Sequence, residues 1–444
     1  MDVRRLDVAI VGAGMSGMLM GIRLKQAGID GFTIYEKAEA VGGTWRENTY
    51  PGLSCDVPSF LYSYSFAPKL DWTHRFAPGA EIRSYFERMA DDYGLREHIR
   101  FGHEIAQARY EPAAARWHIR ATNGDEASAD VLILASGPLH EKKYPEIEGL
   151  DRFAGACFHS AAWDHSVALE GKRIGVIGTG SSAVQMMAPL SEQAAQLTMF
   201  QRTPQWIMPV GNHAYDEGER ARTRRFPWLA RLVRAYYKLL FDTISVAVVK
   251  DGFLRRQLER RCRDYLATVR DPELRRKLTP DYAPGCKRLI MSNTFYPTLE
   301  KPHVHLETSG IERVTERGVV TKDGTLHELD VLVLATGFDA HAWGVEQVVG
   351  AEGKSLQQAW ADGTRSYRSV AMPGFPNFFM LVGPNSPIGN LSVIDVSETQ
   401  STYILKLVQA LAAGRAKAVA PREDATRAFH AALTEAMNDT VWVT

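Results

Sequence analysis

Two glycine-rich segments have residue types and spacing that suit the binding of a dinucleotide. Gly12-Ala-Gly14-Met-Ser16-Gly17 fits GxGxxG, and Gly178-Thr179-Gly180-Ser181-Ser182-Ala183 fits GxGxxA. Small residues at these positions allow a tight turn, a close approach of a pyrophosphate, and close packing of a helix on a strand. The N-terminus of the following helix offers unpaired N–H groups to the phosphates. The sequence therefore predicts two dinucleotide sites.

The residue after the second strand of each unit indicates which dinucleotide it binds. Glu36 holds this position in the first unit, and Arg202 holds it in the second. A carboxylate accepts hydrogen bonds from ribose hydroxyls, whereas an arginine pairs with a 2′-phosphate. The first unit therefore favours FAD, and the second favours NADPH over NADH. An ordinary surface role for Arg202 is the alternative.

The cysteines bear on what accepts the electrons once NADPH has reduced the flavin. A disulfide reductase needs a redox-active cysteine pair, and Cys55 has no second cysteine near it in the sequence. Dioxygen is therefore the favoured acceptor. The four cysteines show no metal-binding spacing, so no metal site is expected, and such scattered thiols are typical of a cytoplasmic protein. These are Cys55, Cys157, Cys262 and Cys286.

The elements that must position these residues follow from the apolar periodicity. Apolar runs at 7–12 and 172–178 precede the glycines, and second strands are expected at 32–35 and 197–201. Segments 105–137 and 311–337 each predict a polar hairpin followed by an apolar strand, and the two strands end similarly. The pattern predicts an α/β fold with two Rossmann-like domains, the second nested in the first.

The expected domain limits place the FAD-binding domain at 1–145 and 325–444 and the NADPH-binding domain at 146–324. A helical insert is expected at about 215–283, where Arg, Leu and Tyr recur at helical spacing. Its arginine-rich stretches, 220–225 and 255–263, could attract a membrane surface, although such runs more often form a solvated helix face.

Composition and charge exclude several other classes of protein. Lys plus Arg and Asp plus Glu number 52 each, and 45% of residues are hydrophobic, so a folded protein without attraction to nucleic acid is expected. No uncharged apolar stretch approaches the roughly 18 residues of a membrane span. The first apolar run leads directly into a glycine loop, so no signal peptide is expected and the predicted location is the cytoplasm.

A longer motif lies between the two glycine segments. Phe153-Ala-Gly155-Ala-Cys-Phe-His159-Ser-Ala-Ala-Trp163-Asp164 fits FxGxxxHxxxW followed by Pro or Asp. With this motif the sequence resembles the Baeyer–Villiger monooxygenases, which are class B flavoprotein monooxygenases related to the flavin-containing monooxygenases. The latter usually end the motif without the tryptophan. A lone linker histidine is more often structural, whereas this match involves five or six fixed positions.

The resemblance extends over nearly the whole chain and is weakest across the insert. The matching segments are 42–45 and 50–62 on the flavin side, 201–204 at the NADPH phosphate, 286–288 around the active-site arginine, 335–339 as the strand returning to the FAD domain, and 383–386 near the flavin. Family members continue past the segment that resembles 438–444 to a further tryptophan lining the active site. This sequence extends to Thr444.

The resemblance implies a mechanism and roles. NADPH would reduce FAD, and dioxygen would then form a C4a-peroxyflavin that converts ketones to esters or lactones, with sulfoxidation as a further possibility. Arg288 would stabilise the anionic species, and Asp56 would pair with Arg288 and steer it. The motif would be a structural linker that couples domain motion to catalysis, through Phe153, Gly155, His159, Trp163 and Asp164. The substrate would be a small, partly apolar organic molecule; its identity and the oligomeric state are not predicted.

The motifs and the resemblance together assign residues to each cofactor. Those expected at FAD are Gly12, Gly14, Ser16, Gly17, Glu36, Lys37, Gly43, Thr44, Trp45, Asp56, Tyr62 and Ile105. Those expected at NADPH are Ser54, Cys55, Asp56, Gly178, Thr179, Gly180, Ser181, Ser182, Arg202, Thr203 and Lys287.

Three alternatives stay open at this point. A flavin-containing monooxygenase that oxidises nitrogen or sulfur would use the same cofactors. A flavin-binding sensor without turnover is disfavoured, because it has no need of NADPH. Arg288 could also be a structural arginine, and Asp56 a turn residue.

Overall fold

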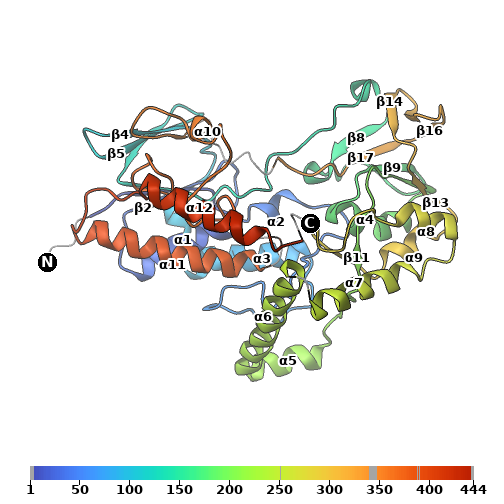
Figure 1. Ribbon diagram of the computed structural model, residues 1–444, viewed down its shortest axis with the longest axis horizontal. Coiled ribbons are helices and arrows are strands. Elements are labelled where there is room, and N and C mark those ends of the chain that lie inside the picture. Colours follow the sequence, from blue (N-terminus) through green and yellow to red (C-terminus); the bar gives the residue numbers. More distant parts are fainter. Residues whose placement is uncertain (1–4, 251, 340–347, 388, 390, 442–444) are drawn as a thin grey trace.

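Two parallel sheets form the cores of two α/β bodies that lie next to each other (Figure 1). The computed structural model describes residues 5–250, 252–339, 348–387, 389 and 391–441. The first sheet has the order β19-β7-β1-β2-β3, with all neighbours parallel. Its strands are β1 (Val8–Val11), β2 (Phe32–Tyr35), β3 (Ile99–Arg100), β7 (Val131–Leu134) and β19 (Phe378–Met380). Helix α1 (Met15–Gln26) joins β1 to β2, as predicted.

The second sheet repeats this plan with the order β13-β10-β9-β17-β8, again parallel throughout. Its strands are β8 (Ala156–His159), β9 (Arg173–Ile177), β10 (Gln196–Phe200), β13 (Val304–Glu307) and β17 (Val331–Leu334). Helix α4 (Ser181–Ser191) joins β9 to β10. The predicted fold class, with two Rossmann-like domains, is confirmed.

Each sheet is accompanied by an antiparallel hairpin layer, as the paired segments predicted. The first comprises β4 (Ile105–Glu111), β5 (Arg116–Ala121) and β6 (Glu126–Ala129), and the short β18 (Val348–Val349) adds to it in parallel with β4. The second comprises β14 (Ile311–Thr315), β15 (Gly318–Thr321) and β16 (Leu326–Glu328). Each layer leads into a strand, β7 or β17, whose four residues are all buried. Burial on both faces is typical of strands inside a parallel sheet.

The predicted domain limit at residue 325 is wrong. β17 lies between β9 and β8 in the second sheet, so the nested domain extends at least to Leu334. A fully buried strand needs hydrogen-bonding neighbours on both edges, and β8 and β9 provide them for β17. The segment 335–339 was expected to be the strand that returns to the FAD domain. That strand is β19, which pairs with β7.

The predicted insert forms four helices: α5 (Glu217–Arg225), α6 (Pro227–Val249), α7 (Phe253–Leu266) and α8 (Pro272–Leu278). Ala230 and Phe241 of α6 are buried in the core of the first domain. Leu258 and Cys262 of α7 are buried in the core of the second domain. The insert thus connects the two cores. Among the described residues, no helix has the length and apolar character to cross a membrane.

Further helices and short strands lie outside the two parallel sheets, the hairpin layers and the insert. They are α2 (Thr44–Glu47), α3 (Gly79–Asp92), β11 (Ile207–Met208), β12 (Ile290–Met291), α9 (Phe295–Leu299), α10 (Leu356–Ala359), α11 (Val393–Ala412) and α12 (Glu423–Met437). Helix α11 packs along α1, as Figure 1 shows.

Candidate functional site

The first glycine loop leaves its backbone open between β1 and α1. Gly12 has φ +101°, and a Cβ built on it would lie 2.8 Å from the Ala135 carbonyl oxygen at the end of β7. A Cβ on Gly17 would lie 1.9 Å from the Gly12 oxygen, so only glycine lets the helix pack this closely. Gly14 faces Gly43, whose Cα lies 3.7 Å from its notional Cβ. The loop and the start of α1 together form a backbone cradle suited to a pyrophosphate.

Glu36 ends β2 and is held beside this cradle. Its carboxylate accepts hydrogen bonds from the backbone N–H of Ala13 (2.8 Å) and of Ala38 (3.0 Å) and pairs with Arg46 (2.9 Å). Only 4% of Glu36 is exposed, and its bonds fix the carboxylate in place. Lys37 lies farther out, 3.9 Å from Glu141. Glu36 is thus a fixed acceptor at the end where an adenosine is expected.

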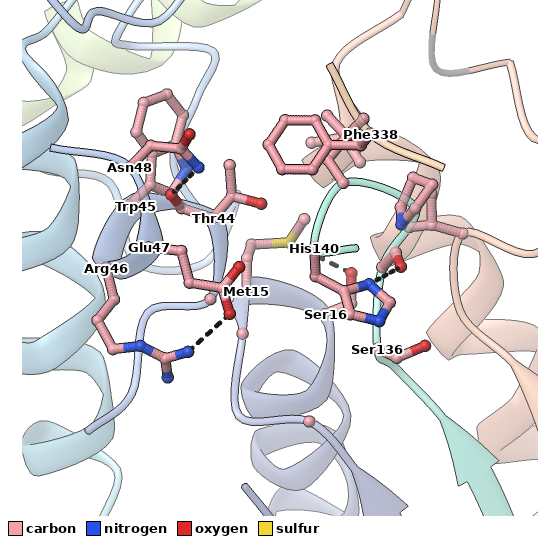
Figure 2. Close-up of a pocket in the computed structure, with 18 of the residues that line it drawn as sticks. Met15, Ser16, Thr44, Trp45, Arg46, Glu47, Asn48, Ser136, His140 and Phe338 are labelled. Atoms are coloured by element: carbon pink, nitrogen blue, oxygen red, sulfur yellow. Dashed lines mark hydrogen bonds and ion pairs between the residues drawn. The ribbon is translucent and has the colours of Figure 1, made fainter. Parts of the chain in front are cut away.

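A cleft of about 980 Å³ runs from this loop to the nested domain. Most residues predicted for the cofactors line it: Gly12, Gly14, Ser16, Glu36, Lys37, Gly43, Thr44, Trp45, Ser54, Cys55, Asp56, Tyr62, Ile105, Gly180, Ser181 and Ser182. The predicted catalytic Arg288 lines it too. Six of the residues predicted for the cofactors are not part of its lining: Gly17, Gly178, Thr179, Arg202, Thr203 and Lys287. Figure 2 shows α2 on one side of this pocket and Ser136, His140 and Phe338 on the other.

Arg288 and Asp56 meet in this cleft across the domain boundary. The Arg288 Nη2 atom lies 2.5 Å and the Nε atom 3.2 Å from the same carboxylate oxygen of Asp56. Burial alone would lower the pKa of Arg288, but the charge and the hydrogen bond of Asp56 outweigh it and raise that pKa. About 46% of the Arg288 side chain is exposed, so the guanidinium is held by Asp56 and is partly exposed at the wall of the cleft. The predicted pair is present.

The neighbours of Asp56 are protonated and buried. Burial, with the nearby charge of Asp56 second, raises the pKa of the Cys55 thiol well above its ordinary value. A protonated thiol is a poor nucleophile, and all four cysteines are free, so no disulfide exchange is supported at this site. Tyr62 accepts a hydrogen bond from the Trp45 indole (3.1 Å), and burial raises its pKa as well.

The second glycine loop repeats the geometry of the first. Gly178 has φ +124°, and its notional Cβ would lie 2.2 Å from the Ala335 carbonyl oxygen at the end of β17. Gly180, at the N-terminus of α4, has open space where a Cβ would be. The Thr179 hydroxyl donates to the Thr203 carbonyl (2.8 Å), which ties the loop to the segment that follows β10. This loop also fits a dinucleotide.

Tyr282 brings Arg202 and Lys287 into one neighbourhood. The Lys287 ammonium lies 4.4 Å from the Tyr282 ring centroid, and the Tyr282 hydroxyl donates to the Pro204 carbonyl (2.9 Å). Arg202 is exposed after β10 and makes no ion pair with any other residue that the structure describes. The two cations thus lie outside the cleft, near the second glycine loop. Tyr282 had not been predicted, because nothing in the sequence marks its contact with Pro204.

The linker motif is folded into the nested domain. His159 ends β8 and is 1% exposed; its Nδ1 accepts from the Ala161 N–H (3.1 Å) and its Nε2 donates to the Gly337 carbonyl (3.1 Å). Burial lowers the pKa of His159, so the neutral form is favoured. Both ring nitrogens are engaged, which fits a structural role and leaves no nitrogen for proton transfer.

The other linker residues also pack or turn the chain. The Trp163 ring lies edge-on to Phe158, with centroids 5.0 Å apart. Asp164 accepts from the N–H (2.9 Å) and hydroxyl (2.6 Å) of Ser166. A Cβ on Gly155 would lie 2.4 Å from the Asp330 carbonyl and 2.7 Å from the Phe153 ring, so glycine is required there.

Sequence reasoning missed a contact that joins the domains beside the site. Tyr50 donates to the Gln185 side chain on α4 (2.9 Å), and Gln185 donates to the Ser54 carbonyl (2.9 Å). Burial raises the pKa of Tyr50 to about 12, so it remains a donor at neutral pH. A Cβ on Gly52 would lie 2.5 Å from the Gln185 carbonyl, and this glycine was the only hint of close packing.

Two Rossmann-like domains whose glycine loops flank one cleft define a dinucleotide-dependent oxidoreductase. The model of the flavin-binding monooxygenase-like family matches residues 5–356. An uncharacterized monooxygenase of Mycobacterium bovis is 49% identical over 438 residues, which cover 98% of this chain and 88% of that protein. A Baeyer–Villiger monooxygenase of Streptomyces coelicolor is 41% identical, and the match covers 98% of this chain and 85% of that protein.

Solved structures agree with these relatives. A crystal structure of cyclohexanone monooxygenase in an open state has a TM-score of 0.89 at 30% identity, covering 99% of this chain and 94% of that one. OTEMO in complex with FAD and NADP has a TM-score of 0.89 at 29% identity, covering 98% and 91%. The chain belongs to the flavin-binding monooxygenase-like family and is related to its Baeyer–Villiger members. It is a flavoprotein monooxygenase with FAD and NADPH as cofactors.

One predicted resemblance lies partly outside the structure. The segment 438–444 was matched to the part of the family that precedes a pocket-lining tryptophan. Its last three residues, 442–444, lie outside the described residues. Thr440 is bridged to Lys250 at the end of α6, and the Cys286 thiol donates to the Val441 carbonyl (3.1 Å). The described end of the chain therefore packs close to the segment that carries Arg288.

Proposed function

We propose that this monooxygenase converts small, partly apolar ketones into esters or lactones. It would insert one oxygen atom of dioxygen next to the carbonyl carbon. The single observation that carries the proposal is the Arg288–Asp56 pair, which lies in the cleft where the two domains meet. Insertion of oxygen next to a carbonyl carbon passes through an adduct with negative charge on the former carbonyl oxygen. A fixed guanidinium stabilises such a charge.

The residues of the chain have separate parts in this proposal. Bound FAD would supply the oxidant after reduction by NADPH. Asp56 holds Arg288 through its Nη2 and Nε atoms, and about 46% of the Arg288 side chain is exposed. The raised pKa keeps the guanidinium protonated at any working pH. Arg202, with Thr203 and Lys287, would bind the 2′-phosphate. The neutral His159 would hold β8 to Gly337 and would not exchange a proton.

We expect the reaction to occur in the cytoplasm, where NADPH is available and thiols remain reduced. All four cysteines of the chain are free. Printed names of relatives support the substrate class, because the Streptomyces coelicolor protein is called a Baeyer–Villiger monooxygenase and a structural relative is a cyclohexanone monooxygenase.

The experiment is product analysis of the purified yellow enzyme with NADPH and oxygen, using cyclic, linear and aryl ketones beside a panel of thioethers. We expect esters or lactones from at least one class of ketone. Arg288→Ala should keep FAD yet form these products about 100- to 1000-fold more slowly, the effect of losing one key electrostatic stabiliser. Arg288→Lys keeps a charge without the fork and should recover little of the rate.

Two results would contradict the proposal. Ester formation by Arg288→Ala at the wild-type rate would show that another group stabilises the adduct. Oxidation of thioethers with no ketone converted would instead favour a heteroatom monooxygenase. Steady NADPH consumption under oxygen separates both enzymes from a flavin-binding protein without turnover.

A further inference from the structure

A row of large apolar side chains is exposed along one side of α6. Its members are Trp228, Leu232, Tyr236, Leu239, Leu240 and Val246, which are between 36% and 69% exposed. At about 100° of rotation per residue they fall within an arc of about 120°. We refer to this row as the α6 stripe. Figure 1 shows α6 standing out from the two α/β bodies, next to α5.

The exposure of the α6 stripe does not come from a loosely attached helix. The opposite side of α6 buries Ala230 and Phe241 in the core of the first domain. Arg234 on that side donates to the carbonyls of Leu61 (2.9 Å) and Ser63 (2.7 Å) and pairs with Asp395 (2.6 Å). The helix is thus apolar on two sides, and one of them is packed. Soluble proteins rarely leave a large apolar patch open unless it contacts something, and six exposed apolar side chains on one side of a single helix favour such a contact.

The next helix begins with two further exposed apolar residues, close to the end of α6 in the sequence. Helix α7 begins with Phe253 and Leu254, which are 66% and 47% exposed. Only Lys250 to Gly252 separate this pair from the end of α6. Aromatic and leucine side chains in such a patch can insert into the boundary between lipid headgroups and acyl chains.

The charge around the α6 stripe indicates what it contacts. Residues 217–256 contain ten Lys and Arg but only four Asp and Glu, whereas the whole chain has 52 of each kind. Arg222, Arg231 and Arg256 are exposed and form no ion pair with any other described residue. The Arg225 guanidinium lies over the exposed Phe226 ring, 5.7 Å from its centroid. The surroundings are therefore basic in an otherwise neutral protein.

We propose that the α6 stripe docks on the surface of an anionic lipid membrane. The arginines would contact the headgroups, and the stripe would enter the interface to a shallow depth. Arg231, Lys238 and Asp242 lie within α6, so the helix would lie along the membrane surface. A second copy of the chain fits less well, because two faces with the same basic excess repel each other.

The proposal is tested by flotation of the full-length, FAD-loaded protein with vesicles. One set contains phosphatidylcholine with phosphatidylglycerol, and the other contains phosphatidylcholine alone. The protein should float with the anionic vesicles, far less with the neutral ones, and less as salt is added. The combined variant Trp228→Ser, Leu232→Ser and Leu239→Ser should lower binding by at least about tenfold, because it removes three apolar anchors.

A matched control and a fold check accompany the variant. Leu326 on β16 is 38% exposed and lies in the nested domain, so Leu326→Ser should bind vesicles like the wild type. FAD absorbance and the midpoint of thermal unfolding should be the same for both variants and the wild type, because the replaced side chains are exposed. The expected loss of vesicle binding is therefore separate from any loss of fold.

Four outcomes would overturn the proposal. The wild type could fail to float with anionic vesicles, or the combined variant could float as well as the wild type. Light scattering could show a wild-type dimer that the variant turns into a monomer without any vesicle binding, which would assign the face to a second copy. Binding to a polyacidic peptide but not to vesicles would assign it to an acidic protein partner.

Discussion

At the scale of single residues, Arg202 and Lys287 are the exposed cations near the second glycine loop, joined through Tyr282 and Pro204. If they bind a 2′-phosphate, NADPH should be preferred to NADH. Arg202→Ala should reduce that preference by a factor of roughly ten to a hundred, since a charge-assisted hydrogen bond contributes about 1.5–3 kcal/mol. Flavin reduction measured with each coenzyme over a range of concentrations checks this.

The matched control for Arg202→Ala is Arg260→Ala, an exposed arginine on α7 that pairs with Asp264. It should leave the coenzyme preference unchanged. Equal use of NADPH and NADH by the wild type would refute the assignment of Arg202.

His159 should give the stability of the protein a particular dependence on pH. Burial lowers its pKa in the folded state below the ordinary value of 6.5. As the pH falls below about 6.5, the unfolded chain takes up a proton that the folded chain resists, so the free energy of unfolding decreases. That loss continues down to the folded pKa. Above 6.5 both states are neutral, and His159 causes no pH dependence.

The measurement is denaturant unfolding at a series of pH values for the wild type and for His159→Gln, which cannot titrate. The free energy of unfolding of the wild type should decrease more steeply below about pH 6.5 than that of the variant. Parallel curves would show that the folded state does not lower the pKa of His159.

Residue types at fixed spacing were the part of the site most open to prediction. The glycines and Glu36 were predicted in this way, whereas Asp56 and Arg288 were assigned through the family resemblance, and the structure brings these two into contact. Tyr50, Gln185 and Tyr282 were not found. Tyr50 and Gln185 act through contacts between residues at least 131 positions apart, and Tyr282 contacts Pro204 across 78 positions. No local sequence pattern encodes such contacts.

At the scale of elements, the loop between β9 and α4 allows a matched pair of substitutions. Gly178→Ala should destabilise the fold by about 1–3 kcal/mol, because φ is +124° and the new Cβ would lie 2.2 Å from a backbone carbonyl. Gly180→Ala places a methyl group in open space, so the fold should keep its stability. The methyl would instead obstruct a pyrophosphate and weaken NADPH binding.

Thermal unfolding and NADPH titration of the two variants separate these effects. Gly180→Ala should unfold like the wild type and bind NADPH more weakly. Wild-type NADPH affinity in Gly180→Ala would mean that the dinucleotide does not cross this loop.

Elements with strong local patterns were predicted, and their place in the sheets was predicted less well. The run 331–334 was expected as a buried strand and is one, yet it was assigned to the wrong domain. Two hairpins that lead into similar strands do not reveal which sheet each strand joins. The pairing depends on which strands lie next to it in the folded protein, and the sequence of the strand itself does not show this. The strand that does return to the first sheet, β19, has only three residues, and this is too short for its apolar pattern to predict a strand.

At the scale of the whole molecule, FAD should contribute to the stability of the fold. The cleft of about 980 Å³ has walls from both domains, so a bound ligand contacts the folded state and not the unfolded chain. Free FAD at 100 times its dissociation constant would add about 2.7 kcal/mol to the free energy of unfolding. Removal of FAD should lower the midpoint of thermal unfolding, and added FAD should restore it.

Chromatography of the pigment released on denaturation identifies the flavin. It should be FAD, because the Glu36 carboxylate is expected to accept hydrogen bonds from the ribose of an adenosine, and FMN contains no adenosine. Release of FMN, or a colourless protein that FAD does not reconstitute, would contradict the assignment.

The Arg234 contacts let the cleft change without any substitution in its walls. Arg234 holds the carbonyls of Leu61 and Ser63, and Tyr62 between them lines the cleft, whereas no described residue of α6 does so. A substitution on the packed side of α6 would therefore shift Tyr62 through the backbone. Directed evolution for a new substrate has a target there that a scan restricted to cleft residues would overlook.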